Sequence, residues 1–170
     1  AISSAASDVY KRQIDSNVGS NNIFILGTPR SGTTLIESII GSSNDVTSGG
    51  ELLSGSKLIN EFVNNKNIKP DDFKKDFKEK YIGRTNFLRG DYRFIIDKLP
   101  ENFLFIGYLL NILPGSKIIR TFRDPWDVAI SLYKQRYVTN IPYSASFFNI
   151  GVCMSNFEAI NIFWSDQIKT

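Results

Sequence analysis

The stretch that decides the fold is NIFILGTPRSGTTLIESIIG, residues 22–41. Its apolar beginning predicts a short buried strand, which stops where the turn residues GTP begin at position 27. A helix is expected from near Gly32, because the apolar residues of LIESII, positions 35–40, follow helical spacing. Gly41 is expected to end that helix in a left-handed conformation. A strand, a tight loop and a helix in immediate succession indicate the opening of an α/β unit.

The loop GTPRSGTT, residues 27–34, has the outline of a phosphate-binding loop. Its two glycines stand between a strand and a helix, so backbone N–H groups can converge on an anion. Thr33 occupies the position where nucleoside-triphosphate loops carry Lys, and Arg30 supplies a cation from another place in the loop. This pattern favours a short anionic 5′ group, such as a phosphosulfate, held by amides, hydroxyls and a guanidinium. The alternative is a Gly/Ser/Thr turn without a ligand.

The rest of the chain alternates between predicted helices and strands. Strands are expected at residues 93–99 and 116–122, and helices at residues 51–64, 70–89, about 101–113, 125–136 and 147–168. Asp124 is expected to cap the helix that starts at Pro125, since Pro is favoured at a first helical position. Strand, helix and strand in succession imply parallel pairing. The predicted fold is a P-loop-like, three-layer α/β/α arrangement around a central parallel sheet.

The length of 170 residues and the apolar content of 42% favour one domain with its own core. We expect this domain to cover residues 22–170 and to be truncated at its C-terminus, because no turn signal closes the last predicted helix. Residues 1–21 are small and polar without periodicity, and are interpreted as a disordered or non-native leader.

Composition restricts the possible functions. A net charge of +3 without a long basic run gives no indication of a nucleic-acid-binding surface. One Cys and no His exclude an internal disulfide and the usual zinc sites, and leave acid–base work to Asp, Glu, Lys, Tyr or Cys. The longest apolar stretch, residues 103–113, is too short to span a bilayer, and no signal-peptide pattern is present, so a cytoplasmic location is the default expectation. Nothing in the sequence indicates an oligomeric state.

Four blocks in order carry a resemblance to a known family: PRSGTTL at 29–35, GE at 50–51, DKLPENF at 97–103 and KIIRTFRDPWDVAISLY at 117–133. Together they resemble the sulfotransferases, especially the branch with tyrosylprotein sulfotransferases and bacterial tetratricopeptide-repeat sulfotransferases. The resemblance implies that 3′-phosphoadenosine 5′-phosphosulfate (PAPS) is the sulfuryl donor and that adenosine 3′,5′-bisphosphate is the product. The acceptor would be a hydroxyl of a protein tyrosine, a carbohydrate or a small molecule. The branch also allows for an upstream helical-repeat domain.

The resemblance also implies which residues bind the donor. The residues that match the family's 5′-phosphosulfate loop are Arg30, Ser31, Gly32, Thr33 and Thr34. Arg123 and Ser131 match the pair that holds the 3′-phosphate. Arg123 has independent physical support, since it follows a predicted strand, where ligands gather in open α/β sheets. In the alternative interpretation Arg123 pairs with Asp124 or Asp127, and Ser131 is a small packing residue.

The implied catalytic residues are Glu51, Lys98 and Arg30. Glu51 matches the general base, while Lys98 and Arg30 would stabilise charge during in-line displacement at sulfur, without a metal. The plainer alternatives are a helix-start glutamate and a strand-end lysine that reaches water. Asp97 alone is weak evidence for magnesium. The rival functions are a P-loop kinase or NTPase, against which Thr33 counts, and a non-catalytic nucleotide-binding fragment.

Overall fold

The computed structural model describes residues 17–135 and 142–168. Most of the predicted leader, residues 1–16, and Arg136, the expected end of one helix, lie outside the described residues. Residues 17–21 form hydrogen-bonded turns that contact the segment before the last strand: Gly115 N donates to Val18 O at 2.9 Å and Lys117 Nζ donates to Ser20 O at 2.8 Å. This end of the predicted leader therefore packs against the domain.

The sheet has four parallel strands in the order β2-β3-β1-β4. They are β1 (Asn22–Leu26), β2 (Val46–Ser48), β3 (Phe94–Asp97) and β4 (Lys117–Arg120). The three predicted strands are confirmed, two of them with shorter bounds. Strand β2 was not predicted, because three residues are too few to show a period of two. Since all strands run in one direction, their carboxyl ends meet at one edge.

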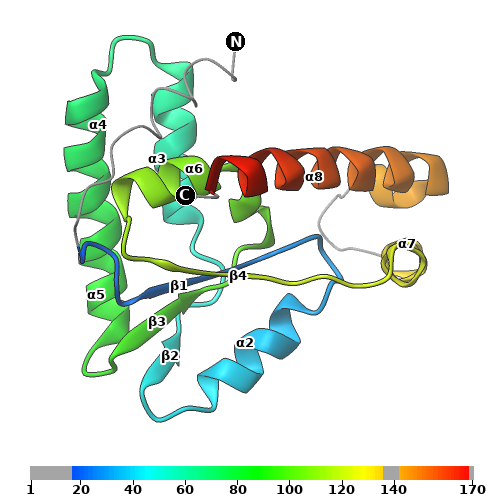
Figure 1. The fold of residues 1–170 in the computed structure, drawn as a ribbon, viewed down its shortest axis with the longest axis horizontal. Helices are drawn as coiled ribbons and strands as arrows, with labels where there is room; N and C mark the ends of the chain where they lie inside the picture. The colour runs from blue at the N-terminus through cyan, green and yellow to red at the C-terminus, as the bar shows by residue number, and fades with distance from the viewer. Residues whose placement is uncertain (1–16, 136–141, 169–170) are drawn as a thin grey trace.

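Helices cover both faces of this sheet, so the predicted three-layer α/β/α arrangement is confirmed. Figure 1 shows α2 on one face, and α3, α4, α6 and α8 on the other. The α-helices are α2 (Thr33–Gly41), α3 (Leu53–Asn64), α4 (Pro70–Phe77), α5 (Gly83–Arg89), α6 (Ile106–Ile112), α7 (Pro125–Lys134) and α8 (Phe147–Ile168). Shorter helical segments are the π-helical η1 (Lys78–Ile82) and the 3-10 helices η2 (Pro100–Leu104) and η3 (Pro142–Ala145).

The alternating directions of the side chains along β1 explain why helices pack on both faces of the sheet. Phe24 and Leu26 belong to a large buried cluster with residues of α3, α4, α6 and α8. Ile23 and Ile25 point to the other face, where Ile36 and its neighbours on α2 cover them. Because successive side chains of a strand face opposite sides, one short apolar run supplies both cores.

Three predicted helices differ in detail. The helix expected at residues 51–64 begins only at Leu53, so Glu51 lies in the loop before it. The helix expected at residues 70–89 is α4, η1 and α5 in direct continuation, with a π-helical turn in the middle. The helix expected from about residue 101 is divided into η2 and α6.

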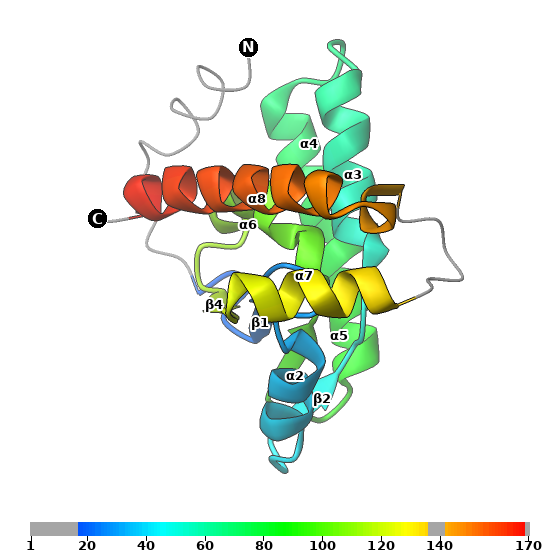
Figure 2. The same ribbon diagram turned by 90° about the vertical axis from the view of Figure 1, so that its right-hand side faces the viewer.

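Two predicted helix ends have different outcomes. Gly41 is the last residue of α2 and has no positive φ, so the expected left-handed end is wrong. The cap of α7 is confirmed: Asp124 Oδ1 accepts hydrogen bonds from Trp126 N at 2.9 Å and Asp127 N at 3.2 Å. Figure 2 shows α7 beside α8, and the two share a buried cluster that includes Val128 and Ile150. Helix α7 therefore starts at the carboxyl edge of the sheet and is fixed there.

Candidate active site at the carboxyl edge of the sheet

The loop between β1 and α2 is held tightly by the residue that follows β4. A Cβ atom on Gly27 would lie 2.3 Å from Thr121 Oγ1 and 2.9 Å from Thr121 O, so only glycine fits there. Ser31 Oγ and Thr121 Oγ1 share a buried hydrogen bond of 2.6 Å. The sequence did not single out Thr121, which lies inside the strand predicted at residues 116–122, whereas the observed β4 ends at Arg120.

The loop backbone has an unusual conformation at its centre. Among the described residues, Arg30 is the only non-glycine with a positive φ, 73°, and Gly32 follows with a φ of 99°. Such a conformation at Arg30 costs about 1–3 kcal/mol and is typical of ligand-binding sites. Gly32 has no side chain to cap α2, and nothing lies within 4 Å of the place a Cβ would take. The first amides of α2 can therefore bind an anion.

The structure brings together Arg30 and Ser131, two residues for which the family resemblance implies contacts to opposite ends of the donor. Arg30 Nε donates a hydrogen bond of 2.9 Å to Ser131 Oγ on α7. This bond uses the Nε–H of the guanidinium, so the N–H groups of its two terminal nitrogens stay available as further donors. Ser131 is thus not merely a packing residue.

Arg123 contacts a carboxylate in this structure. Its Nε and Nη2 donate to Asp127 Oδ2 at 3.3 and 3.2 Å, with both side chains about half exposed. Asp127 is one of the partners that the alternative interpretation named. An exposed pair of this kind contributes little stability, so a phosphate could take the place of Asp127. The assignment of Arg123 to a 3′-phosphate stays a prediction.

Glu51 and Lys98 form an ion pair on adjacent strand ends. Lys98 Nζ lies 2.6 Å from Glu51 Oε1, and Lys98 N donates to Gly50 O at 2.9 Å. The Lys98 side chain is only 10% exposed, while that of Glu51 is 53% exposed. The interpretation of Lys98 as a lysine that reaches water is therefore wrong. The loop is linked to the same region, since Gly27 N donates to Pro100 O at 3.4 Å.

A second carboxylate, which sequence reasoning missed, faces the same ammonium. Glu37 Oε2 on α2 lies 3.9 Å from Lys98 Nζ, and its side chain is 13% exposed. Ser48 Oγ donates to Glu37 Oε1, and Gly50 N donates to Ser48 Oγ at 3.1 Å. The available signal was spacing: Glu37 follows Thr33 by one helical turn and so lies on the same side of α2.

Asp97 points away from this pair and into the core. Its Oδ2 accepts a hydrogen bond of 2.5 Å from Tyr81 OH, and its Oδ1 accepts one of 3.4 Å from Leu52 N. Burial raises the pKa of Asp97 to about 6, although both hydrogen bonds act in the opposite direction. Burial, followed by the charge of Asp97, raises the pKa of Tyr81 well above its ordinary value. Asp97 thereby anchors the backbone on both sides of the ion pair.

Residues 17–135 and 142–168 hold no group of three or more His, Cys, Asp and Glu side chains that could bind a metal ion. They also contain no helix whose length and apolar character would let it cross a membrane.

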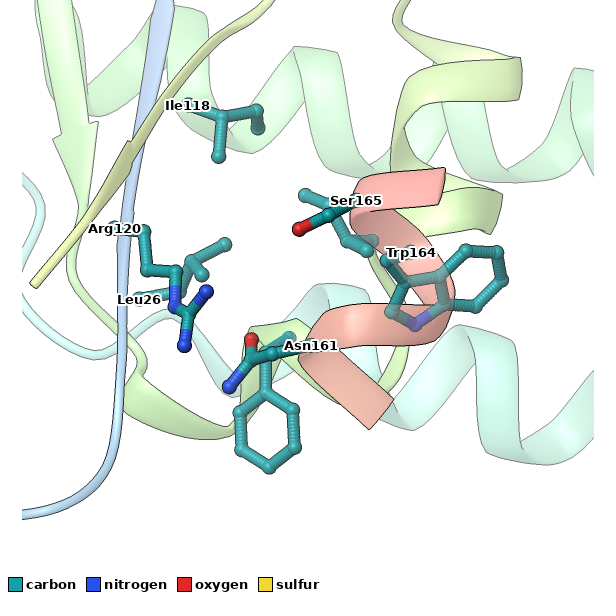
Figure 3. A pocket seen from close by; sticks show the side chains of 8 residues that line it. Leu26, Ile118, Arg120, Asn161, Trp164 and Ser165 are labelled. Atoms are coloured by element: carbon teal, nitrogen blue, oxygen red, sulfur yellow. The ribbon is translucent and has the colours of Figure 1, made fainter. Parts of the chain in front are cut away.

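A cavity of about 270 Å³ lies elsewhere, between the sheet and α8 (Figure 3). Its lining is mostly apolar and consists of Leu26, Phe103, Ile106, Ile118, Arg120, Asn161, Trp164 and Ser165. Arg120 Nη2 donates to Glu158 Oε2 at 2.8 Å, so the guanidinium in this cavity already has a carboxylate partner. None of the predicted site residues lines the cavity.

Comparison with known proteins identifies the family to which most of the chain is similar. Residues 22–160 match the sequence model of the sulfotransferase family. An Aquifex aeolicus (strain VF5) protein named "Uncharacterized protein" is 36% identical over 129 residues, which are 68% of this chain and 17% of that protein. A Caenorhabditis briggsae protein named "Putative protein-tyrosine sulfotransferase" is 26% identical over 155 residues, which are 86% of this chain and 51% of that protein. The chain thus spans at most about half the length of these two relatives.

Proposed function

Because this chain belongs to the sulfotransferase family, we propose that it binds PAPS and transfers the sulfuryl group to an acceptor hydroxyl. The observation that carries this proposal is the Lys98–Glu51 ion pair of 2.6 Å at the edge of the sheet that also holds the anion-binding loop. A phosphate loop that has Thr33 where nucleoside-triphosphate loops carry Lys suits a donor whose 5′ group is shorter than a triphosphate. A carboxylate and an ammonium stand beside this loop and could act as base and cation in the transfer.

In the proposed complex, the donor contacts the loop between β1 and α2 at one end and the residues that follow β4 at the other. The amides at the start of α2 and the hydroxyls of Thr33 and Thr34 receive the 5′-phosphosulfate. The Ser31 hydroxyl is bonded to Thr121 Oγ1, and the Ser31 amide donates to Thr28 O at 3.1 Å. Ser31 can therefore contact the donor only when one of these two bonds opens. Arg123 and Ser131 receive the 3′-phosphate once Arg123 releases Asp127.

The proposed transfer divides its work among three side chains. Glu51 takes the proton of the acceptor hydroxyl as the acceptor oxygen forms its bond to sulfur. The bond between sulfur and the bridging phosphate oxygen breaks, and its electron pair stays on that oxygen. Lys98 stabilises this growing charge, and Arg30 stabilises charge on the sulfuryl oxygens. The products are a sulfate ester, adenosine 3′,5′-bisphosphate and a protonated Glu51.

Nucleotide preference tests the proposal against a P-loop kinase or NTPase. We expect adenosine 3′,5′-bisphosphate at about 100 times its Kd to raise the melting temperature by about 5–10 °C, since it stabilises only the folded state. ATP with magnesium should cause little change. The measurement is thermal unfolding followed by circular dichroism, with Arg123→Ala expected to reduce the shift. Stabilisation by ATP with magnesium and not by the bisphosphate would contradict the proposal.

Side-chain removal tests catalysis against a non-catalytic nucleotide-binding module. We expect Glu51→Ala and Lys98→Ala to lower the rate of sulfuryl transfer by about 100-fold or more while bisphosphate binding survives. The assay uses the native-length protein and follows labelled sulfate from PAPS to an acceptor. Three acceptors are compared: a tyrosine peptide, a carbohydrate and a small phenol. The tyrosine peptide is included because the name of one relative refers to protein tyrosine. Lys80→Ala, at an exposed lysine, is the matched control. Unchanged transfer in both variants would remove Glu51 and Lys98 from the mechanism.

A further inference from the structure

Two carboxylates compete for one ammonium at the candidate active site. Lys98 Nζ lies 2.6 Å from Glu51 Oε1 and 3.9 Å from Glu37 Oε2. Lys98 and Glu37 are enclosed, with side chains 10% and 13% exposed, whereas the Glu51 side chain is 53% exposed. Glu51 is therefore the carboxylate that an acceptor can reach, and Glu37 is the one that stays inside.

The observed pairing has to change during the proposed transfer. Lys98 Nζ is bonded to Glu51 Oε1 at 2.6 Å, whereas its proposed role requires the ammonium to turn toward the leaving oxygen and stabilise it. Both oxygens of Glu51 are then open to the acceptor's proton. For an enclosed ammonium, leaving its nearer carboxylate without another anion close by would be costly, because the ammonium has also lost its hydration. Lys98 therefore needs a second anionic partner within reach, and Glu37 is in that position.

Glu37 is held by neighbours that also hold the loop of the base. Its Oε1 accepts a hydrogen bond from Ser48, which leaves Oε2 facing Lys98. Ser48 Oγ in turn accepts a hydrogen bond of 3.1 Å from Gly50 N, the residue directly before Glu51. Glu37 is thus fixed in orientation, and it is connected to the backbone that positions the base.

We propose that Glu37 is a positioning residue, which keeps the ammonium of Lys98 in place when Glu51 is released to accept the proton. This inference rests on the proposed sulfuryl transfer. Glu37 itself exchanges no proton and forms no bond to sulfur. Its negative charge allows Lys98 to leave Glu51 without leaving the site, so its effect belongs to the transfer step and not to donor binding.

The test is Glu37→Gln in the native-length protein, because glutamine keeps the shape and can still accept from Ser48. We expect kcat to fall about tenfold or more, as for other losses of active-site positioning. The Kd for adenosine 3′,5′-bisphosphate should stay the same or decrease, since a negative charge near an anionic ligand has been removed. Glu37→Asp, which keeps the charge on a shorter side chain, should retain more activity. Glu61→Gln, at an exposed glutamate on α3, should match the wild type.

The outcomes separate this inference from the proposed function. A merely structural role would weaken bisphosphate binding and lower the melting temperature together with kcat, which would overturn the inference. Wild-type kcat in Glu37→Gln would also overturn it, while transfer that still depends on Glu51 would leave the function standing. If Glu37→Gln does not fold, Ser48→Ala serves instead, with a smaller fall in kcat and unchanged bisphosphate affinity expected. A wild-type protein that neither binds the bisphosphate nor transfers sulfate would overturn both proposals.

Discussion

Asp97 and Lys98 are neighbours in sequence with opposite surroundings at the end of β3. Asp97 is buried against Tyr81, while Lys98 pairs with Glu51 at the strand edge. The alternation of side chains along extended backbone produces this division. Asp97 therefore anchors the backbone from within the core, and Lys98 faces the candidate site.

The raised pKa of Asp97 predicts a specific pH dependence of stability. The pKa is about 6 in the folded protein, against an ordinary value of 3.8, so between these values the folded state binds more protons than the unfolded state. The free energy of unfolding therefore falls as the pH rises through this window. Relative to Asp97→Asn, the wild type should lose on the order of 2–3 kcal/mol between pH 4 and pH 7.

Urea denaturation of both proteins at several pH values measures this difference. Tyr81→Phe provides an internal check, because it removes a hydrogen bond that favours the charged carboxylate and should extend the fall to higher pH. A difference between wild type and Asp97→Asn that is constant from pH 4 to pH 7 would contradict the assigned cause.

At the residue scale, sequence motifs predicted part of the candidate site. Arg30, Glu51 and Lys98 were identified from their places in family motifs, and the structure brings Glu51 and Lys98 into contact. Glu37 and Thr121 were not identified, because their importance arises from contacts between segments that are distant in sequence. Such contacts depend on strand order, which no local pattern contains.

At the element scale, helix α7 carries Ser131, which accepts a hydrogen bond from Arg30, and it begins directly after its N-terminal cap, Asp124. Asp124 satisfies two amides at the start of the helix, and we expect Asp124→Ala to lower the free energy of unfolding by about 1 kcal/mol. Urea denaturation checks this, with Asp91→Ala at an exposed turn as the control. A loss in Asp124→Ala no larger than that in Asp91→Ala would show that the cap contributes nothing.

Elements with a clear apolar pattern, helical spacing or boundary cue were predictable, whereas the three-residue strand β2 and the π-helical turn η1 were not. The cue of Asp124 followed by Pro125 located α7, and helical spacing located α8 with the bounds Phe147–Ile168. Strand β2 has only three residues, and its place in the sheet comes from pairing with β3. The π-helical turn η1 also has no sequence signal. It lies where Tyr81 reaches Asp97, so tertiary contact accompanies the irregularity.

At the scale of the whole molecule, strand order creates the candidate site. Strand β1 lies between β3 and β4, which places the anion-binding loop between Lys98 on one side and Thr121 on the other. Arg30 and Ser131, which are far apart in sequence, thus meet at the carboxyl edge of the sheet. As proposed above, this edge would bind the phosphosulfate end of a nucleotide through amides, hydroxyls and one guanidinium.

A crystal structure of the protein with adenosine 3′,5′-bisphosphate would decide whether the nucleotide binds in this way. We expect the 5′-phosphate within hydrogen-bonding distance of the amides of residues 32–34, and the 3′-phosphate at Arg123 and Ser131, with Arg123 no longer paired to Asp127. A nucleotide bound in another place, or a loop that stays empty at saturating nucleotide, would contradict it.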